Sequence, residues 1–189
     1  MRRAVAALLA VVVVLPATAD AVRISDRYDA DIREAAERYM PTVDWRLWKA
    51  QLYQESRLDP DAVSPVGARG LAQFMPATWE QVASQLGYGH VSPHAARPAI
   101  IAGAYYMGQL RSQWSAPRPE ADRHSLGVAS YNAGLGNVLA AQRRCDNAAL
   151  YRQIIACLPD VTGRHARETK TYVARIWRWW RELLLGIGG

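Results

Sequence analysis

The sequence has little of what a metal or redox site requires. Its 189 residues include only two cysteines and four histidines. Cys145 and Cys157 are too far apart for a CxxC redox motif, and Pro93 interrupts the histidine pair with helical spacing, His90 and His94. The chain also lacks a P-loop, a dinucleotide-binding fingerprint and a G-x-S-x-G motif. We therefore expect neither a metal nor a cofactor.

The apolar run at the N-terminus is too short for a membrane span. Residues 4–15 are apolar, follow Arg2 and Arg3, and precede Pro16 and two overlapping small-x-small sites. This order is typical of a secretory signal, whereas a membrane-spanning helix needs about 20 apolar residues. We interpret residues 1–21 as a signal peptide, with a retained N-terminal anchor in the inner membrane as the alternative. Under both interpretations the chain is exported to the periplasm or cell envelope.

Export of the chain would place the two cysteines in an oxidising compartment. An oxidising compartment favours a disulfide between Cys145 and Cys157. The bridge would close a loop of about 13 residues and contribute roughly 3 kcal/mol in the chain-entropy model. The alternative is a pair of free, buried thiols.

Composition indicates a folded, basic protein. Half of the residues are hydrophobic and 21% are charged, which is typical of a globular chain, and the length suits one domain. The net charge is +6, so nucleic acid, an anionic membrane or an anionic cell-wall polymer would each fit as a partner. Because the arginines are spread along the chain, an ordinary solvated basic surface is the alternative.

Apolar residues recur mostly with helical spacing. They predict a first helix that stops at Pro41, a second that ends at Asp59-Pro60, and later helices over 78–86, 99–114 and 167–185. Short helical pieces surround the "SYNAGLGN" stretch, and the connector "DPDAVSPVGARG" is rich in turn residues. We find no convincing β-hairpin, repeat or low-complexity tract. The sequence therefore predicts a single, mainly α domain.

Glu55 occupies an unusual position in the second predicted helix, for which Asp44 is a good N-cap. Trp48 and Leu52 precede it by seven and three residues, so Glu55 continues a buried stripe. Burial disfavours the charged carboxylate, and the pKa of Glu55 should rise toward that of a proton donor near neutral pH. The alternative is a carboxylate at a helix end, paired with Arg57.

Several blocks in the chain resemble one enzyme family. They are Glu55-Ser56, "SPVGA" (64–68), "GLAQFMP" (70–76), "YNAG" (131–134), and Glu-Thr with Tyr-Val in 168–173. A further stretch, "AGAYYMGQL" (102–110), looks like the central helix of the same family. Together, and in this order, they resemble the signature of the soluble-type (SLT) lytic transglycosylases, lysozyme-like enzymes that cut the glycan of peptidoglycan. The resemblance covers roughly residues 40–178. It departs at Ala72, where the family commonly has Met.

The resemblance implies a lysozyme-like fold, with a catalytic domain over residues 22–178. The reaction would cleave the β-1,4 bond between N-acetylmuramic acid and N-acetylglucosamine and leave a 1,6-anhydromuramic end, with Glu55 as the single acid/base. Peptidoglycan glycan strands, not nucleic acid, would be the partner of a monomeric enzyme. Six further positions would bind the substrate: Ser64, Gln73 and Met75 around the muramic acid, Tyr131 and Asn132 holding Glu55 and the sugar, and Glu168 in the outer cleft.

Two other functions stay open at this point. One is a muramidase that hydrolyses the same bond with water. The other is a non-catalytic protein that binds the wall or the membrane through its basic, Trp-rich C-terminal helix. Residues 179–189, the Trp- and Leu-rich end of that helix, lie beyond the matching blocks. We expect them to close the domain by packing, and peripheral contact with a membrane is the alternative.

Overall fold

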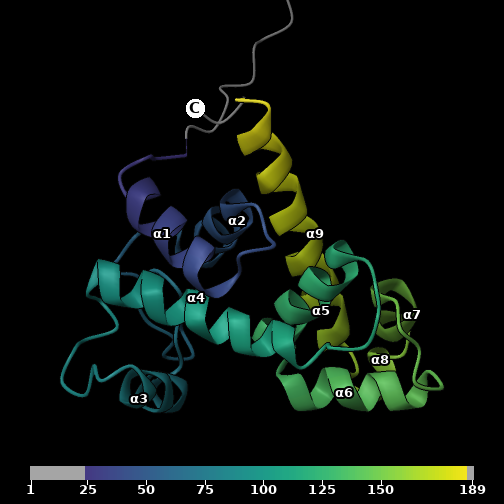
Figure 1. Ribbon diagram of the computed structural model, residues 1–189. Coiled ribbons are helices and arrows are strands. Elements are labelled where there is room, and N and C mark those ends of the chain that lie inside the picture. The colour runs from purple at the N-terminus through teal and green to yellow at the C-terminus, as the bar shows by residue number, and fades with distance from the viewer. Residues whose placement is uncertain (1–23, 187–189) are drawn as a thin grey trace, which may run out of the picture.

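The computed structural model describes residues 24–186, and its regular elements there are helices (Figure 1). The mainly α class predicted from the sequence is therefore confirmed. The predicted signal peptide, residues 1–21, lies outside the described residues. The helices are α1 (Asp29–Tyr39), α2 (Trp45–Ser56), α3 (Pro76–Gln85), α4 (Ala96–Ser112), α5 (Glu120–Ala133), α6 (Leu135–Arg144), α7 (Tyr151–Ala156), α8 (Pro159–Thr162) and α9 (His165–Leu184).

Local signals account for the ends of α2 and for the start of α3. Asp44 caps α2, because its carboxylate accepts a hydrogen bond from the Arg46 amide at 2.8 Å. Helix α2 nevertheless ends at Ser56, before the predicted stop at Asp59-Pro60, since Arg57 takes a left-handed conformation with φ 58°. Helix α3 begins at Pro76, earlier than predicted, because proline is favoured in the first turn, where its missing N–H has no intrahelical partner.

Helix α2 lies at the centre of the packing that positions Glu55. It contacts both α1 and α9, while α4 packs against α1 and α5 (Figure 1). Trp48 of α2 is fully buried and faces α4 at Gly103, where a Cβ would lie only 2.6 Å from the indole ring. The absence of a side chain at Gly103 thus lets the large indole fill the space between α2 and α4.

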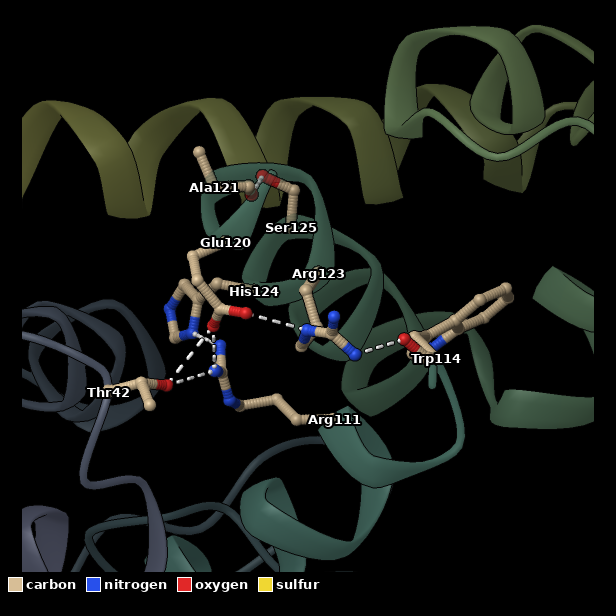
Figure 2. Close-up of polar contacts among 8 residues, drawn as sticks. All are labelled: Thr42, Arg111, Trp114, Glu120, Ala121, Arg123, His124 and Ser125. Atoms are coloured by element: carbon tan, nitrogen blue, oxygen red, sulfur yellow. Dashed lines mark hydrogen bonds and ion pairs between the residues drawn. The ribbon is translucent and has the colours of Figure 1, made fainter. Parts of the chain in front are cut away.

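A polar cluster with two buried members, Arg111 and His124, joins α4 and α5 to the connection between α1 and α2 (Figure 2). The buried guanidinium of Arg111 donates to Glu120 at 2.8 Å, and to the Thr42 hydroxyl and His124 Nδ1, both at 3.1 Å. Burial, followed by the charge of Arg111, lowers the pKa of His124 to about 3, so this ring stays neutral and accepts the hydrogen bond. Because removing one partner of a buried charge is strongly destabilising, the cluster fixes these elements relative to one another.

Helix α9 packs on the rest of the domain along one face. Its buried face includes Tyr172, Ile176 and Trp179, and the Trp179 indole donates to Gln54 Oε1 at 3.0 Å. Beyond this face, Leu184 and Leu185 are 44% and 71% exposed. None of the helices within residues 24–186 combines the length and apolarity that a membrane crossing requires.

The predicted disulfide between Cys145 and Cys157 is present. It links the residue after α6 to the residue after α7. The alternative of two free thiols is therefore wrong.

Candidate functional site

Glu55 lies in the last turn of α2, and its side chain is half-buried where α2 packs against α9. Desolvation raises its pKa from 4.5 to about 7, so the carboxyl group is close to half-protonated at neutral pH. Arg57 does not neutralise it. The Arg57 guanidinium lies over the rings of Tyr53 and Trp179, at 4.5 Å and 5.1 Å from their centroids. The carboxyl group can therefore act as a proton donor and, after donation, as a base.

The phenol of Tyr172, on α9, donates a hydrogen bond to Glu55 Oε1. This bond opposes the desolvation and lowers the pKa of Glu55, because it stabilises the charged form. In turn, burial and the nearby charge of Glu55 hold the pKa of Tyr172 well above its usual range, so the phenol remains a donor. The resemblance assigned no role to Tyr172. Its polar end on an otherwise apolar helix face was the signal that could have found it.

The Tyr172→Phe variant should therefore raise the pKa of Glu55 further. A hydrogen bond to a charged group is worth enough that we expect a rise of about one pH unit. A ¹³C-carboxyl NMR titration of the two proteins measures the change directly. An unchanged or lower pKa in the variant would show that the phenol does not stabilise the carboxylate.

The connector between α2 and α3 folds back beside the end of α2. Ser56 Oγ donates to Leu71 O at 2.9 Å, which ties the connector to the helix that carries Glu55. Gln73 has a left-handed backbone, φ 48°, and its side-chain amide nitrogen donates to Gly70 O at 2.9 Å and to Ala62 O at 3.2 Å. The amide oxygen of Gln73 is thereby left for another partner.

Ser64 and Met75 occupy the same connector with different surroundings. Ser64 Oγ accepts a hydrogen bond from the Ala68 amide at 2.9 Å, which closes a tight turn within the connector. The Met75 side chain is 43% exposed at the start of α3. The hydrogen bonds within the described residues thus tie Ser64 to its own turn and not to Glu55.

Tyr131 connects α5 to this connector. Its phenol donates to Ala72 O at 2.7 Å, and the charge of Glu55 contributes, after burial, to raising the pKa of Tyr131 well above its usual range. The structure therefore brings Tyr131, Tyr172 and the backbone next to Gln73 together around Glu55. Ala72, where the family commonly has Met, is fully buried and would lie 3.1 Å from a Cβ at Gly103, so its small side chain affects the packing between the connector and α4.

A groove of about 850 Å³ continues from the end of α2 along α9. Gln54 and Tyr172 line it beside Glu55, and two residues predicted to bind substrate, Asn132 and Glu168, line it farther out. Asn132 Oδ1 accepts a hydrogen bond from the Thr169 hydroxyl at 2.8 Å, which fixes the amide at the groove wall. Residues 24–186 contain no cluster of three or more His, Cys, Asp or Glu side chains placed to hold a metal ion.

Residues 32–154 match the family model of the transglycosylase SLT domain. The chain is 33% identical over 140 residues to the membrane-bound lytic murein transglycosylase F of Shewanella pealeana, covering 72% of this chain and 28% of the relative. It is 39% identical over 118 residues to the membrane-bound lytic murein transglycosylase F 1 of Alkalilimnicola ehrlichii, covering 62% of this chain and 22% of the relative. The chain thus spans about a quarter of the length of these curated relatives.

Solved structures give the same assignment for the fold. An inactive Glu-to-Gln variant of the lytic transglycosylase Slt from Pseudomonas aeruginosa aligns with 88% of this chain and 25% of its own, at a TM-score of 0.67 and 26% identity. The 70 kDa soluble lytic transglycosylase of Escherichia coli aligns with 86% of this chain and 25% of its own, at a TM-score of 0.65 and 23% identity. These similarities confirm the predicted lysozyme-like fold. With the family match over residues 32–154, they establish that the chain belongs to the transglycosylase SLT family.

Proposed function

We propose that this chain is a peptidoglycan lytic transglycosylase, with Glu55 as its single acid/base. It cleaves the β-1,4 bond between N-acetylmuramic acid and N-acetylglucosamine and forms a 1,6-anhydromuramic end. The observation that carries the proposal is the Glu55 carboxyl group itself. Desolvation holds its pKa at about 7 beside a groove of about 850 Å³ that Gln54 and Tyr172 line. Such a group can donate and recover a proton within one catalytic cycle at neutral pH.

The reaction needs no second carboxylate. Protonated Glu55 donates its proton to the glycosidic oxygen, the C1–O bond breaks, and an oxocarbenium-like centre develops on the muramic acid. The C6 hydroxyl of the same sugar then forms the new bond to C1. Because this nucleophile is already tethered, its attack is effectively unimolecular. The Glu55 carboxylate takes the hydroxyl proton, which restores the acid.

The neighbouring residues have proposed roles that fit their contacts. The Tyr172 hydrogen bond orients the Glu55 carboxyl group and stabilises it after it has lost its proton. Tyr131 holds the connector against α5, and Gln73 presents its amide oxygen to the muramic acid unit. We assign Ser64 and Met75 to the same muramic acid unit from the resemblance alone, since neither lines the groove along α9. Asn132 and Glu168 bind the outer part of the glycan in the groove.

The relatives support this activity and a place in the cell envelope. The Shewanella and Alkalilimnicola proteins are named membrane-bound lytic murein transglycosylases, and the Pseudomonas structure is that of an enzyme inactivated by a single Glu-to-Gln change. We propose that this chain also acts in the periplasm, as a monomer. If residues 1–21 are retained, they tether it to the inner membrane. The exposed Leu184 and Leu185 at the end of α9 would be its peripheral contact with the bilayer.

Product analysis tests the activity and separates it from muramidase action. Purified sacculi digested with the protein should yield muropeptides whose muramic ends are one water lighter than hydrolysis products, because the sugar's own hydroxyl replaces the water molecule. Liquid chromatography with mass spectrometry resolves the two kinds of end, and a commercial muramidase provides the hydrated standard. Predominantly hydrated ends would identify a hydrolase and reject the transglycosylase assignment.

A further inference from the structure

One flank of α9 carries a line of positive charge, which we call the basic stripe. The helix begins just after Arg164, and further basic residues follow on the same side over its length. Their spacing of three to five residues keeps them on one flank of an α-helix, opposite the face that packs on α2 and α5. The basic stripe consists of Arg164, Arg167, Lys170, Arg175, Arg178 and Arg181.

Most of these cations have no acidic partner. Within residues 24–186, the one ion pair formed by the stripe joins Arg178 to Glu182 at 3.6 Å. By contrast, Arg97 on α4 contacts both Asp31 and Glu34 of α1, and Arg111 is paired with Glu120. The other five cations of the stripe are thus available to an external anion. They are exposed, apart from Lys170, which is half-buried.

The stripe is continuous with the site at Glu55. Its first four cations line the 850 Å³ groove that begins at Gln54 and Tyr172. A second groove of about 480 Å³ shares Lys170 and Arg175 with the first and continues to Arg178 and Arg181. A polymer bound across Glu55 would therefore place its neighbouring substituents along the basic residues of α9.

We propose that the basic stripe is a binding site for the free carboxylates of the stem peptides that peptidoglycan carries on its muramic acid units. This inference rests on the proposed function. The glycan backbone of that polymer is nearly uncharged, whereas its peptide substituents end in carboxylates. Arg and Lys are the side chains that pair with carboxylates, and Arg does so with two parallel hydrogen bonds. The stripe thus selects glycan strands that still bear their peptides.

The surroundings of the stripe favour peptides over an anionic lipid surface. Membrane-bound helices combine basic residues with apolar side chains that insert beside them. No Leu, Ile, Val, Phe or Trp side chain of the described residues lines either groove, and the exposed large apolar residues at the end of α9, Leu184 and Leu185, lie beyond the last cation of the stripe. The cations instead line concave surfaces, which suit flexible peptide chains.

The test neutralises the middle of the stripe in the full chain. The triple variant Arg167→Gln/Lys170→Gln/Arg175→Gln is compared with a matched control, Arg143→Gln/Arg144→Gln/Arg152→Gln. The control removes the same charge from exposed positions on α6 and α7 that line neither groove. Each protein is assayed on intact sacculi and on the same sacculi after an amidase has removed the stem peptides. Cosedimentation is measured as well, in a Glu55→Gln background, so that binding is read without cleavage.

We expect the stripe variant to lose about tenfold in kcat/KM and in binding on intact sacculi, since exposed ion pairs each contribute only a few-fold. On peptide-free glycan it should equal the parent, and the control should equal the parent on both. The difference on intact sacculi should shrink at high salt, because exposed charges are screened.

Three results would overturn the inference. An equal loss on both substrates would mean that the stripe contacts the sugars or is needed for folding. No loss on either substrate would mean that the stripe is only a solvated charged surface. If the stripe variant binds phosphatidylglycerol vesicles more weakly than the parent does, but binds peptidoglycan equally well, the stripe is a lipid-binding surface. If the parent cleaves neither substrate, the proposed function fails, while cosedimentation still decides whether the stripe recognises stem peptides.

Discussion

In Glu55→Gln, release of soluble muropeptides from sacculi is expected to fall by about 10³-fold, because general acid–base catalysis by one group contributes on this order. The amide has nearly the shape of the acid and can still accept the Tyr172 hydrogen bond, but it cannot donate a proton to a glycosidic oxygen. Chromatography of the digest measures the loss. A variant that releases muropeptides as fast as the parent would remove Glu55 from the mechanism and favour a non-catalytic mode of action.

The same variant has a stability signature that serves as its control. The folded pKa of Glu55, about 7, lies above the ordinary 4.5, so the folded state binds more protons than the unfolded state between these values. The parent therefore loses stability as the pH rises from about 4.5 to about 7, by roughly 3 kcal/mol in total. Glutamine does not ionise, and Glu55→Gln should be more stable than the parent at about pH 8 but not at about pH 4. Urea denaturation at the two pH values measures this difference. A variant destabilised at both would mean that its inactivity comes from misfolding.

Gly70→Ala should be the most destabilising single-methyl change in the connector. Gly70 has φ +74°, and a Cβ there would lie 2.0 Å from the carbonyl oxygen of Pro93, which is backbone and cannot rotate away. The left-handed conformation and the overlap together should lower the free energy of unfolding by about 4 kcal/mol. Because Gly70 O also accepts the Gln73 side-chain hydrogen bond, its displacement should reduce activity in the remaining folded protein.

Gly67→Ala provides the matched comparison. Gly67 has φ +88°, yet nothing lies within 4 Å of the added methyl group. Only the left-handed backbone opposes this change, so a loss of about 1 kcal/mol is expected. Thermal denaturation of both variants tests the argument. Equal losses would show that the Pro93 contact relaxes without cost.

The sequence predicted those parts of the site that depend on local pattern. The helical register of Trp48 and Leu52 placed Glu55 on a buried stripe, and the Asp44 cap placed the start of its helix. The compartment implied by the N-terminal segment favoured the Cys145–Cys157 disulfide, which is present. In each case residues near in sequence, or a chemical environment, were sufficient to decide.

The parts that the sequence could not predict depend on contacts between distant segments. The Tyr172–Glu55 hydrogen bond spans 117 residues of chain, and no periodicity relates its two partners. The sequence predicted a basic C-terminal helix, but the continuity of its basic stripe with the groove beside Glu55 depends on how α9 packs against α2. The end of α2 at Ser56 was misjudged because a left-handed Arg57, which stacks on Trp179 of α9, stops the helix before the proline does.

The polar cluster of α4 and α5 restricts how this sequence can change over time. Arg111 is 6% exposed, and its partners include Glu120 and the neutral His124. Gly127 belongs to the same unit, since a Cβ there would lie 2.8 Å from Arg111 Cγ. Replacing Glu120 or His124 leaves the buried Arg111 with fewer partners and a side chain at Gly127 crowds it, whereas replacing the whole set by apolar residues of similar volume would cost little. Substitutions at these four positions should therefore be energetically coupled, so that the effect of one depends on which residues occupy the other three.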